Sequence, residues 1–534
     1  MSRITRLFWR AGVAVIFGCL LSSTVFAQFD TATVLGTIRD ASGNVVPGAK
    51  ITLTNTGTEI SATTMTDENG FYQFLNVKIG TYRVSAELSG FSTAVVNDVT
   101  VSVNARQRID LALKVGALTE TVQITDGARL VEAESSDRGQ VINRQQIVEL
   151  PLNGRQYSTL ALLSTGIRQS TLAASVDSQG GDAREGSFNA NGLRSTFNNF
   201  LLDGVDNNSY GTSNQNFSNQ AMQVSPDALE EFKVVTNNMS AEFGRSGGAV
   251  INASVKSGTN QFHGGLWEFV RNTNLNAVGF FKPLGGVKPV LHRNQFGGIF
   301  GGPIRRNSTF FFLSYEGFRE VSRVPLFSSL PTLNDRIGLF DKPVTNPLTK
   351  ETFAANTPIP TNKLTPFALK VLGDLPKPTI AGRANNFQYS PSSRDFNDKF
   401  DLKFDHHFNA RTTAFVRIGQ RKSNVFNEPV IPGPSGGSGN GFTRVLNQQI
   451  AGAVTWTPTA SSLLEFRMGI TRTRAGKEPV GIGGPSMREL FGITGLPEDR
   501  TLTGPLTTQN ITGFTSLGRR PSNPQWQHPF VVNP

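Results

Sequence analysis

The feature that most constrains this chain is a strict alternation of apolar and polar side chains in its second half. It is clearest in residues 399–408, KFDLKFDHHF, and in residues 463–472, LLEFRMGITR. A period of two predicts β-strands with one apolar and one polar face. A soluble sandwich would give the same pattern, but these strands are long and their polar faces carry charge. Such strands are typical of a barrel that turns its apolar face to lipid.

The connections between these strands are expected to alternate in length. Short turns are predicted at Asn409-Ala410 and Thr457–Ser462, and long loops at Arg421–Asn447 and Val321–Asn386. Short turns at one end and long loops at the other are a property of outer-membrane barrels. We therefore expect residues 261–534 to form an antiparallel transmembrane sheet.

The N-terminus carries an export signal. Arg3, Arg6 and Arg10 precede an apolar core, and Ala27 offers a small residue for cleavage, so residues 1–27 are predicted to be a signal peptide. A lipid-attachment site at Cys19, the single cysteine, is the alternative. No apolar run of 18 or more residues follows this segment, so the sequence predicts no transmembrane helix.

Composition favours a β-rich protein and argues against nucleic-acid binding. The 54 glycines and 39 phenylalanines, with only 17% charged residues, favour turns and aromatic strands over helices. The formal charge is +11, and removal of the leader with its three arginines and no acid leaves +8. These charges are scattered rather than clustered, so we expect no nucleic-acid partner.

Residues 28–116 are predicted to form a small β-sandwich, because six short alternating runs are separated by turn residues. The predicted strands are Thr33–Arg39, Lys50–Asn55, Ser61–Thr66, Phe71–Leu75, Gly80–Leu88 and Val99–Leu113. The order GTIRDASGNVVPGAKITLTN, TDENGFYQF and GTYRVSAELSGF resembles the carboxypeptidase regulatory-like domain, an immunoglobulin-like and transthyretin-like sandwich. The resemblance implies a fold without an activity. None of the five histidines lies in this segment, and none begins a zinc-binding pattern.

Residues 127–260 have the pattern of a compact α+β domain. Short helices are expected at Asn143–Glu149 and Gln156–Leu163, and a third is expected to begin at Ser225, which precedes a proline and acidic residues. Short apolar strands are expected at Asn199–Leu202 and Ala249–Val255, between turn residues. No phosphate-binding glycine motif occurs.

Two motifs in this domain, NGLRSTFNNFLLDGVDNN and AEFGRSGGAVINASVKSG, resemble the plug domain of TonB-dependent outer-membrane transporters. Sandwich, plug and barrel follow one another here as in the Oar-like group. The plug motif positions are Asn191, Gly192, Arg194, Asn199, Asp203, Gly204, Asp206, Asn207, Gly244, Gly247, Gly248, Asn252 and Gly258. The acidic and amide residues at 203–208 lack calcium-loop spacing, so a turn is the better interpretation and no metal is predicted.

Residues 117–126, ALTETVQITD, form an extended polar segment between the sandwich and the plug. A plain linker would look the same, as would a strand gripped by a partner through β-augmentation. The segment resembles the TonB box of the transporter family. The corresponding residues are Glu120, Thr121, Val122, Gln123, Ile124 and Thr125.

The resemblance implies a non-enzymatic receptor or transporter in a Gram-negative type outer membrane, with the sandwich in the periplasm and no cofactor. Its partners would be membrane lipid, the inner-membrane TonB complex and a ligand whose class stays open: siderophore, peptide, oligosaccharide or protein. Either uptake or export would fit. The alternative is a membrane-anchored adhesion or carbohydrate-binding protein that uses the sandwich.

The length of the barrel segment raises a further expectation. Residues 261–534 support about 10–14 strands at about 10 membrane residues each, whereas the transporter barrels have about 22. The final residues, SNPQWQHPFVVNP, lack the alternating terminal strand expected of the family. The sequence thus predicts a truncated barrel whose last strand is an unpaired edge.

Overall fold

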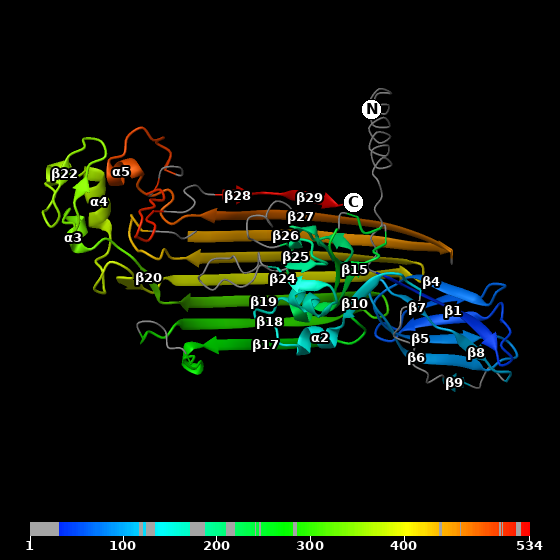
Figure 1. The fold of residues 1–534 in the computed structure, drawn as a ribbon. Helices are drawn as coiled ribbons and strands as arrows, with labels where there is room; N and C mark the ends of the chain where they lie inside the picture. The colour runs from blue at the N-terminus through cyan, green and yellow to red at the C-terminus, as the bar shows by residue number, and fades with distance from the viewer. Residues whose placement is uncertain are drawn as a thin grey trace, which may run out of the picture.

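The structure is a computed structural model. It describes residues 31–116, 121–123, 134–170, 187–209, 219–240, 242–244, 247–280, 286–436, 441–459, 461–500, 504, 506–518 and 525–533. The expected signal peptide lies outside these residues, as do Glu120, Ile124 and Thr125. The mainly β fold class is confirmed, with a sandwich, a small α+β domain and a large antiparallel sheet in chain order (Figure 1).

The N-terminal sandwich consists of two sheets around an apolar core. One contains β4 (Phe71–Val77), β1 (Ala32–Asp40), β7 (Arg106–Arg108) and β8 (Leu111–Leu113). The other runs β3 (Ser61–Met65), β2 (Lys50–Asn55), β5 (Gly80–Glu87), β6 (Thr93–Val101) and β9 (Thr121–Gln123). Alternate residues of both sheets meet in the core, where Ile38, Ile51 and Val84 are fully buried.

The single predicted strand at Val99–Leu113 was wrong. The chain instead turns after β6, with Asn104 at a positive φ of 57°, and continues as the short strands β7 and β8 on the opposite sheet. Asparagine tolerates this left-handed conformation better than most residues. The change of sheet closes the sandwich.

The plug is built on a five-stranded sheet in the order β10-β15-β16-β13-β14. Their bounds are β10 (Arg138–Ile142), β15 (Leu229–Asn237), β16 (Val250–Val255), β13 (Asn199–Leu202) and β14 (Val205–Asp206). Beside this sheet are α2 (Arg144–Glu149), η1 (Tyr157–Leu163), η3 (Ser195–Phe197) and the strand pair β11 (Ile167–Gln169) and β12 (Phe188–Ala190). A capping box at Asn143 begins α2, as the sequence predicted.

Two predicted helices of the plug were wrong in type or extent. The segment at Tyr157–Leu163 is a 3₁₀ helix. The helix expected from Ser225 is only one 3₁₀ turn, η5 (Pro226–Ala228), before β15 begins. Ser225 provides no side-chain cap, because its hydroxyl donates to Glu316 of the large sheet at 3.0 Å. The apolar and β-branched residues that follow then favour a strand.

The large sheet, called here the wall, is antiparallel throughout (Figure 1). Its strands in order are β17 (His263–Asn272), β18 (Val290–Arg305), β19 (Thr309–Arg323), β24 (Ser392–Asn409), β25 (Thr412–Asn427), β26 (Gly441–Thr459), β27 (Ser462–Glu478), β28 (Gln525–Gln527) and β29 (Phe530–Asn533). Both β28 and β29 are short and pair with β27. The sheet is open, not a closed barrel, across the residues that the structure describes.

The predicted two-faced character of the wall is confirmed. Val416, Ile450 and Phe466 are exposed on the outer face, by 46%, 54% and 63%. The alternating Asp401 and Arg417 are buried on the inner face, against the plug. An apolar outer face and a polar inner face are what a sheet between lipid and an aqueous lumen requires.

Within the residues that the structure describes, the wall has fewer strands than the 10–14 predicted, and most of its strands are long. From β18 to β27 each wall strand contains 15–19 residues. Strands occupy both ends of the loop expected at Arg421–Asn447, because β25 extends to Asn427 and β26 begins at Gly441. The two expected turns lie between β24 and β25 and between β26 and β27.

The long loops meet at the far end of the wall and pack together, at the left of Figure 1. They contain β20 (Leu326–Ser328), α3 (Leu333–Arg336), β21 (Val344–Thr345), β22 (Thr352–Phe353), α4 (Pro366–Asp374), β23 (Phe387–Tyr389) and α5 (Met487–Phe491). Leu330, Ile431 and Phe491 share one apolar cluster although they come from three different loops. The loops thus form a folded cap, which the sequence did not predict.

No helix among the described residues is long and apolar enough to cross a membrane.

Candidate functional site: the interface between plug and wall

A tight hairpin of the plug presents Asp203 to the wall. Strands β13 and β14 are joined by Asp203 and Gly204, both at positive φ, of 50° and 70°. Two consecutive left-handed residues are the signature of a short hairpin turn, and aspartate and glycine are residues that tolerate it. The backbone N–H of Val255 donates to Asp203 Oδ1 at 3.0 Å, which fixes the buried carboxylate.

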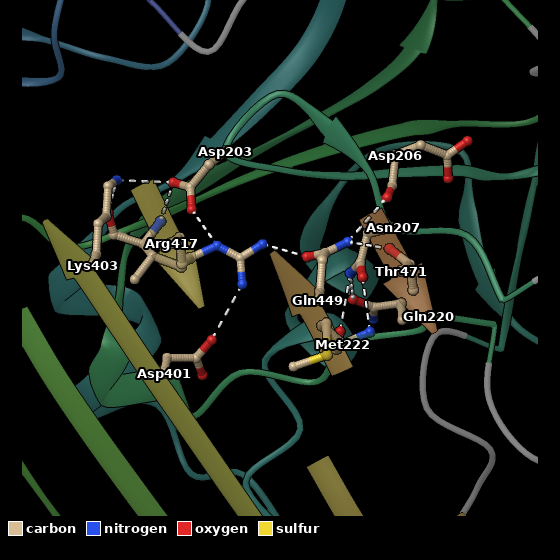
Figure 2. A network of polar contacts seen from close by, with 11 residues as sticks. Asp203, Asp206, Asn207, Gln220, Met222, Asp401, Lys403, Arg417, Gln449 and Thr471 are labelled. Atoms are coloured by element: carbon tan, nitrogen blue, oxygen red, sulfur yellow. Dashed lines mark hydrogen bonds and ion pairs between the residues drawn. The ribbon is translucent and has the colours of Figure 1, made fainter. Parts of the chain in front are cut away.

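Three charged groups of the wall surround this carboxylate (Figure 2). Lys403 Nζ lies 3.0 Å from Asp203 Oδ1, and Arg417 Nε lies 2.8 Å from Oδ2. Arg417 also reaches Asp401, with 3.3 Å between Nη1 and Oδ1. All four side chains are at least 93% buried, so water screens them little. The plug supplies one negative charge and the wall a net positive one, so docking neutralises the cluster.

A network of amides and hydroxyls continues from this cluster along β26 and β27 (Figure 2). Arg417 donates to the side-chain carbonyl of Gln449. The Gln449 amide in turn donates to Thr471 Oγ1 at 2.9 Å and to the backbone carbonyl of Asp206 at 3.2 Å. Within the plug, Asn207 exchanges two hydrogen bonds with the backbone of Met222, at 2.8 and 2.9 Å. The predicted motif residues 203 and 206 therefore contact the wall, and Asn207 supports them from within the plug.

A second ionic cluster holds the other side of the plug. Arg155 Nε lies 2.9 Å from Glu316 Oε2 of β19, and Arg155 also pairs with Asp227 of the plug. Lys399 Nζ approaches Glu316 Oε1 at 3.4 Å. The Arg155 guanidinium lies over the Trp267 ring, 5.2 Å from its centroid. Sequence reasoning missed Arg155 and Glu316, although an arginine after an Asn-Gly turn was a signal for a special position.

The remaining predicted positions support the plug's own fold. Asn191 donates to the backbone carbonyl of Thr236 at 2.9 Å, and Asn199 to that of Gly244 at 3.1 Å. Asn252 is buried in β16, whereas Arg194 is exposed before η3. The glycines of the motifs lie in turns and close contacts, namely Gly192, Gly247 and Gly248.

Gly258 marks a close approach between plug and wall. A Cβ atom there would lie 2.4 Å from the Phe311 carbonyl oxygen and 2.6 Å from that of Gly302. Real Cβ atoms do not come so near to backbone oxygens, so only glycine fits without a shift. The chain passes from plug to wall at this position.

Glu231 links the plug to the sandwich. It is 5% exposed on β15, and its carboxylate accepts a hydrogen bond from the backbone N–H of Val103. Burial raises the pKa of Glu231 to about 7, against the opposing effect of the Val103 hydrogen bond. The neighbouring Glu230 raises this pKa further, and Lys233 lowers it.

The described part of the TonB-box-like segment lies on the edge of the sandwich. Strand β9 pairs in parallel with β6, so that Thr121 to Gln123 stand opposite Thr93 to Val95. This segment and the plug motif are therefore in different parts of the molecule.

Comparison with protein families places all three parts of the chain. Residues 33–114 match the carboxypeptidase regulatory-like domain, residues 132–250 the TonB-dependent receptor plug domain, and residues 254–533 the outer membrane beta barrel domain. A curated relative, the TonB-dependent transporter Oar of Myxococcus xanthus, is 26% identical over 329 residues, which are 58% of this chain and 29% of that protein.

Solved structures resemble the chain more distantly. The outer membrane transporter YddB of Escherichia coli has a TM-score of 0.43 at 14% identity, covering 65% of this chain and 40% of YddB. The siderophore receptor PirA of Acinetobacter baumannii has a TM-score of 0.40 at 13% identity, covering 68% of this chain and 43% of PirA. The chain thus spans less than half the length of these relatives.

The barrel match alone covers more than half of the chain, and it follows the sandwich and plug matches in the order that the fold displays. TonB-dependent transporters and receptors are not a class of enzymes. The chain belongs to the outer membrane beta barrel family, with the domain set of a TonB-dependent receptor of the Oar-like type.

Proposed function

We propose that this chain acts as a TonB-dependent outer-membrane transporter, in which a displaceable plug controls passage along the wall. Substrate would bind on the side of the long loops. The segment Glu120–Thr125 would be gripped by the periplasmic part of the TonB complex, and the sandwich would lie in the periplasm after cleavage of the leader. The ligand class stays open among siderophore, peptide, oligosaccharide and protein.

The observation that carries this proposal is the set of polar contacts between plug and wall at the Asp203 hairpin. Asp203 meets Lys403 and Arg417 through ion pairs, and Gln449 meets the Asp206 backbone through a hydrogen bond. Water can replace each of these contacts when the plug shifts, since exchanging one hydrogen-bond partner for another has a small net cost. An apolar contact would have to expose its surface to water instead.

The arrangement also suits force applied from one end. The sandwich and the short turns lie at the same end of the wall, and the folded cap lies at the opposite end (Figure 1). The described residues of the TonB-box-like segment, Thr121–Gln123, pair with β6 of the sandwich, which lies at that first end. A pull there would act on the plug from the side away from the cap. The alternative of a sandwich-based adhesin has no separate observation in its favour.

The test uses a cysteine probe, because the substrate is unknown. Val205 is 3% exposed between the plug hairpin and the wall, so Val205→Cys in a Cys19→Ser background reports plug displacement. We expect a membrane-impermeant maleimide to label this cysteine slowly in cells that lack TonB and faster in energised cells. Deleting residues 118–125 is expected to abolish the acceleration while leaving the amount of chain in the outer membrane unchanged. Equal labelling with and without TonB would refute the proposal.

A further inference from the structure

The sandwich is fastened to the end of the wall and plug by contacts with each of them. Lys78 Nζ, in the turn between β4 and β5, lies 2.8 Å from Asp405 Oδ1 of β24. At the junction of plug and wall, Asn260 donates from its side chain to the Thr58 carbonyl at 2.7 Å. Glu231 of the plug accepts the hydrogen bond from the Val103 backbone. The sandwich is therefore held in one orientation rather than tethered only by a linker.

A cavity of about 750 Å³ lies under the sandwich at this junction. All three parts of the molecule line it: Asn55 and Tyr82 come from the sandwich, Ser254 from the plug, and Thr413 and Arg467 from the wall. Lys403 also lines it, so the cavity begins directly beside the Asp203 cluster. Hydroxyl, amide and charged side chains outnumber apolar ones in the lining, which also includes Phe310 and Phe415 of the wall.

From this geometry we infer that the sandwich is a lid that closes the cavity next to the plug. Any solute that passed the Asp203 hairpin along the wall would enter this cavity and meet the sandwich. Movement of the sandwich would then clear the way for the solute to leave. The role of the lid in transport rests on the proposed function, whereas its opening and closing do not require TonB.

The latch between Lys78 and Asp405 is suited to a reversible closure. Asp405 is 3% exposed and Lys78 is 31% exposed at their side chains, so the lysine can return to water when the lid leaves. Strand β6 of the lid pairs through its backbone with β9, which is the edge strand of that sheet. A pull on the TonB-box-like segment would therefore act first on the lid, through this strand pair.

The experiment measures access to the cavity in the purified full chain, folded in detergent without TonB. Thr413→Cys, in a Cys19→Ser background, places a thiol in the cavity lining, and a maleimide on a bulky polymer reports its exposure. Lys78→Glu sets two negative groups against each other at the latch, and we expect it to raise the labelling rate about tenfold. The charge swap Lys78→Glu with Asp405→Lys is the matched control and is expected to restore the slow rate.

A disulfide provides the opposite perturbation. A Cβ atom at Gly57 would lie 3.8 Å from the Cβ of Thr259, which is the spacing of about 3.8 Å found in disulfides. Gly57→Cys and Thr259→Cys are added to the Thr413→Cys chain, and the bond between positions 57 and 259 is formed first and verified by peptide mass. We expect this bond to lower the labelling rate of the thiol at position 413 about tenfold. Reduction should reverse this.

Two results would overturn the lid. One is rapid labelling of the thiol at position 413 that neither the disulfide nor the charge reversal changes, because the cavity would then be open whatever the sandwich does. The other is failure of the cysteines at 57 and 259 to form a bond in the folded chain, because the sandwich would then not rest on the junction. Neither result depends on TonB, so failure of the lid is distinguishable from failure of the proposed function, which the labelling at position 205 tests.

Discussion

Replacing Asp203 by asparagine should loosen the plug without unfolding it. The substitution keeps the shape of the side chain and its place in the turn but removes the negative charge between Lys403 and Arg417, at 3.0 and 2.8 Å. Leaving a buried charge without its partner costs about 3–5 kcal/mol. Arg417 keeps Asp401 as a partner, so we expect the lower end, about 3 kcal/mol.

The assay is hydrogen–deuterium exchange of the plug strands in the purified chain. A loss of about 3 kcal/mol corresponds to an increase of roughly a hundredfold in the opening equilibrium of β13 and β16. Asp206→Asn is the matched control. It removes the same charge from the same hairpin, at a carboxylate that accepts two hydrogen bonds from Asn208. We expect that control to change exchange by less than about tenfold.

A double substitution tests the cause. Combining Asp203→Asn with Lys403→Met removes one charge of each sign and leaves the pair of Arg417 and Asp401 balanced. The double variant should therefore recover part of the protection of β13 and β16 from exchange. The coupling free energy between the two substitutions should be about 1 kcal/mol or more. Unchanged exchange in Asp203→Asn, or additive losses in the double variant, would refute the reasoning that charge pairing docks the plug.

Three further outcomes follow from the geometry. The pKa of Glu231, raised by burial to about 7, means that the folded state keeps a proton that the unfolded state releases above about 4.5. Stability should therefore fall by up to roughly 3 kcal/mol as pH rises from about 4.5 to 7, and Glu231→Gln should abolish that slope in urea unfolding. Gly258→Ala should impair docking of the plug on the wall, because its Cβ would meet the Phe311 carbonyl, and the plug should then be proteolysed faster. Gly373→Ala, in open space on α4, is the control and should not change proteolysis. Arg336→Ala removes hydrogen bonds to four backbone carbonyls of the cap and should increase proteolysis of residues 333–376 alone.

The sequence predicted most of the strand architecture because the apolar–polar alternation and the turn residues are local signals. The alternation in residues 399–408 fixed which side chains of β24 face the plug, and turn residues located the hairpin at Asp203. Long-range pairing was not predictable in the same way. The partners of Asp203 are 200 and more residues away, on neighbouring strands whose register the sequence alone does not reveal.

The wrong predictions share a physical cause in tertiary contacts. Ser225 has the sequence context of a helix cap, yet its hydroxyl bonds Glu316 of the wall and the helix ends after one turn. The loops near Leu330 and Ile431 have polar, glycine-rich sequences typical of irregular chain, yet their scattered apolar residues meet in one cluster. In each case a contact between distant segments overrides the local preference.

The most direct test of the account is a covalent bond between plug and wall. A Cβ atom at Gly469 of β27 would lie 3.3 Å from the Cβ of Val205, a little closer than the spacing of about 3.5–4.5 Å found in disulfides. After a shift of a few tenths of an ångström, Val205→Cys and Gly469→Cys should form a disulfide in the resting protein. With that bond formed, energised cells should no longer show displacement of the plug, measured as TonB-dependent exposure of its strands to added protease, and reduction should restore it. Undiminished exposure with the bond intact would contradict the claim that the plug moves away from the wall at the Asp203 hairpin.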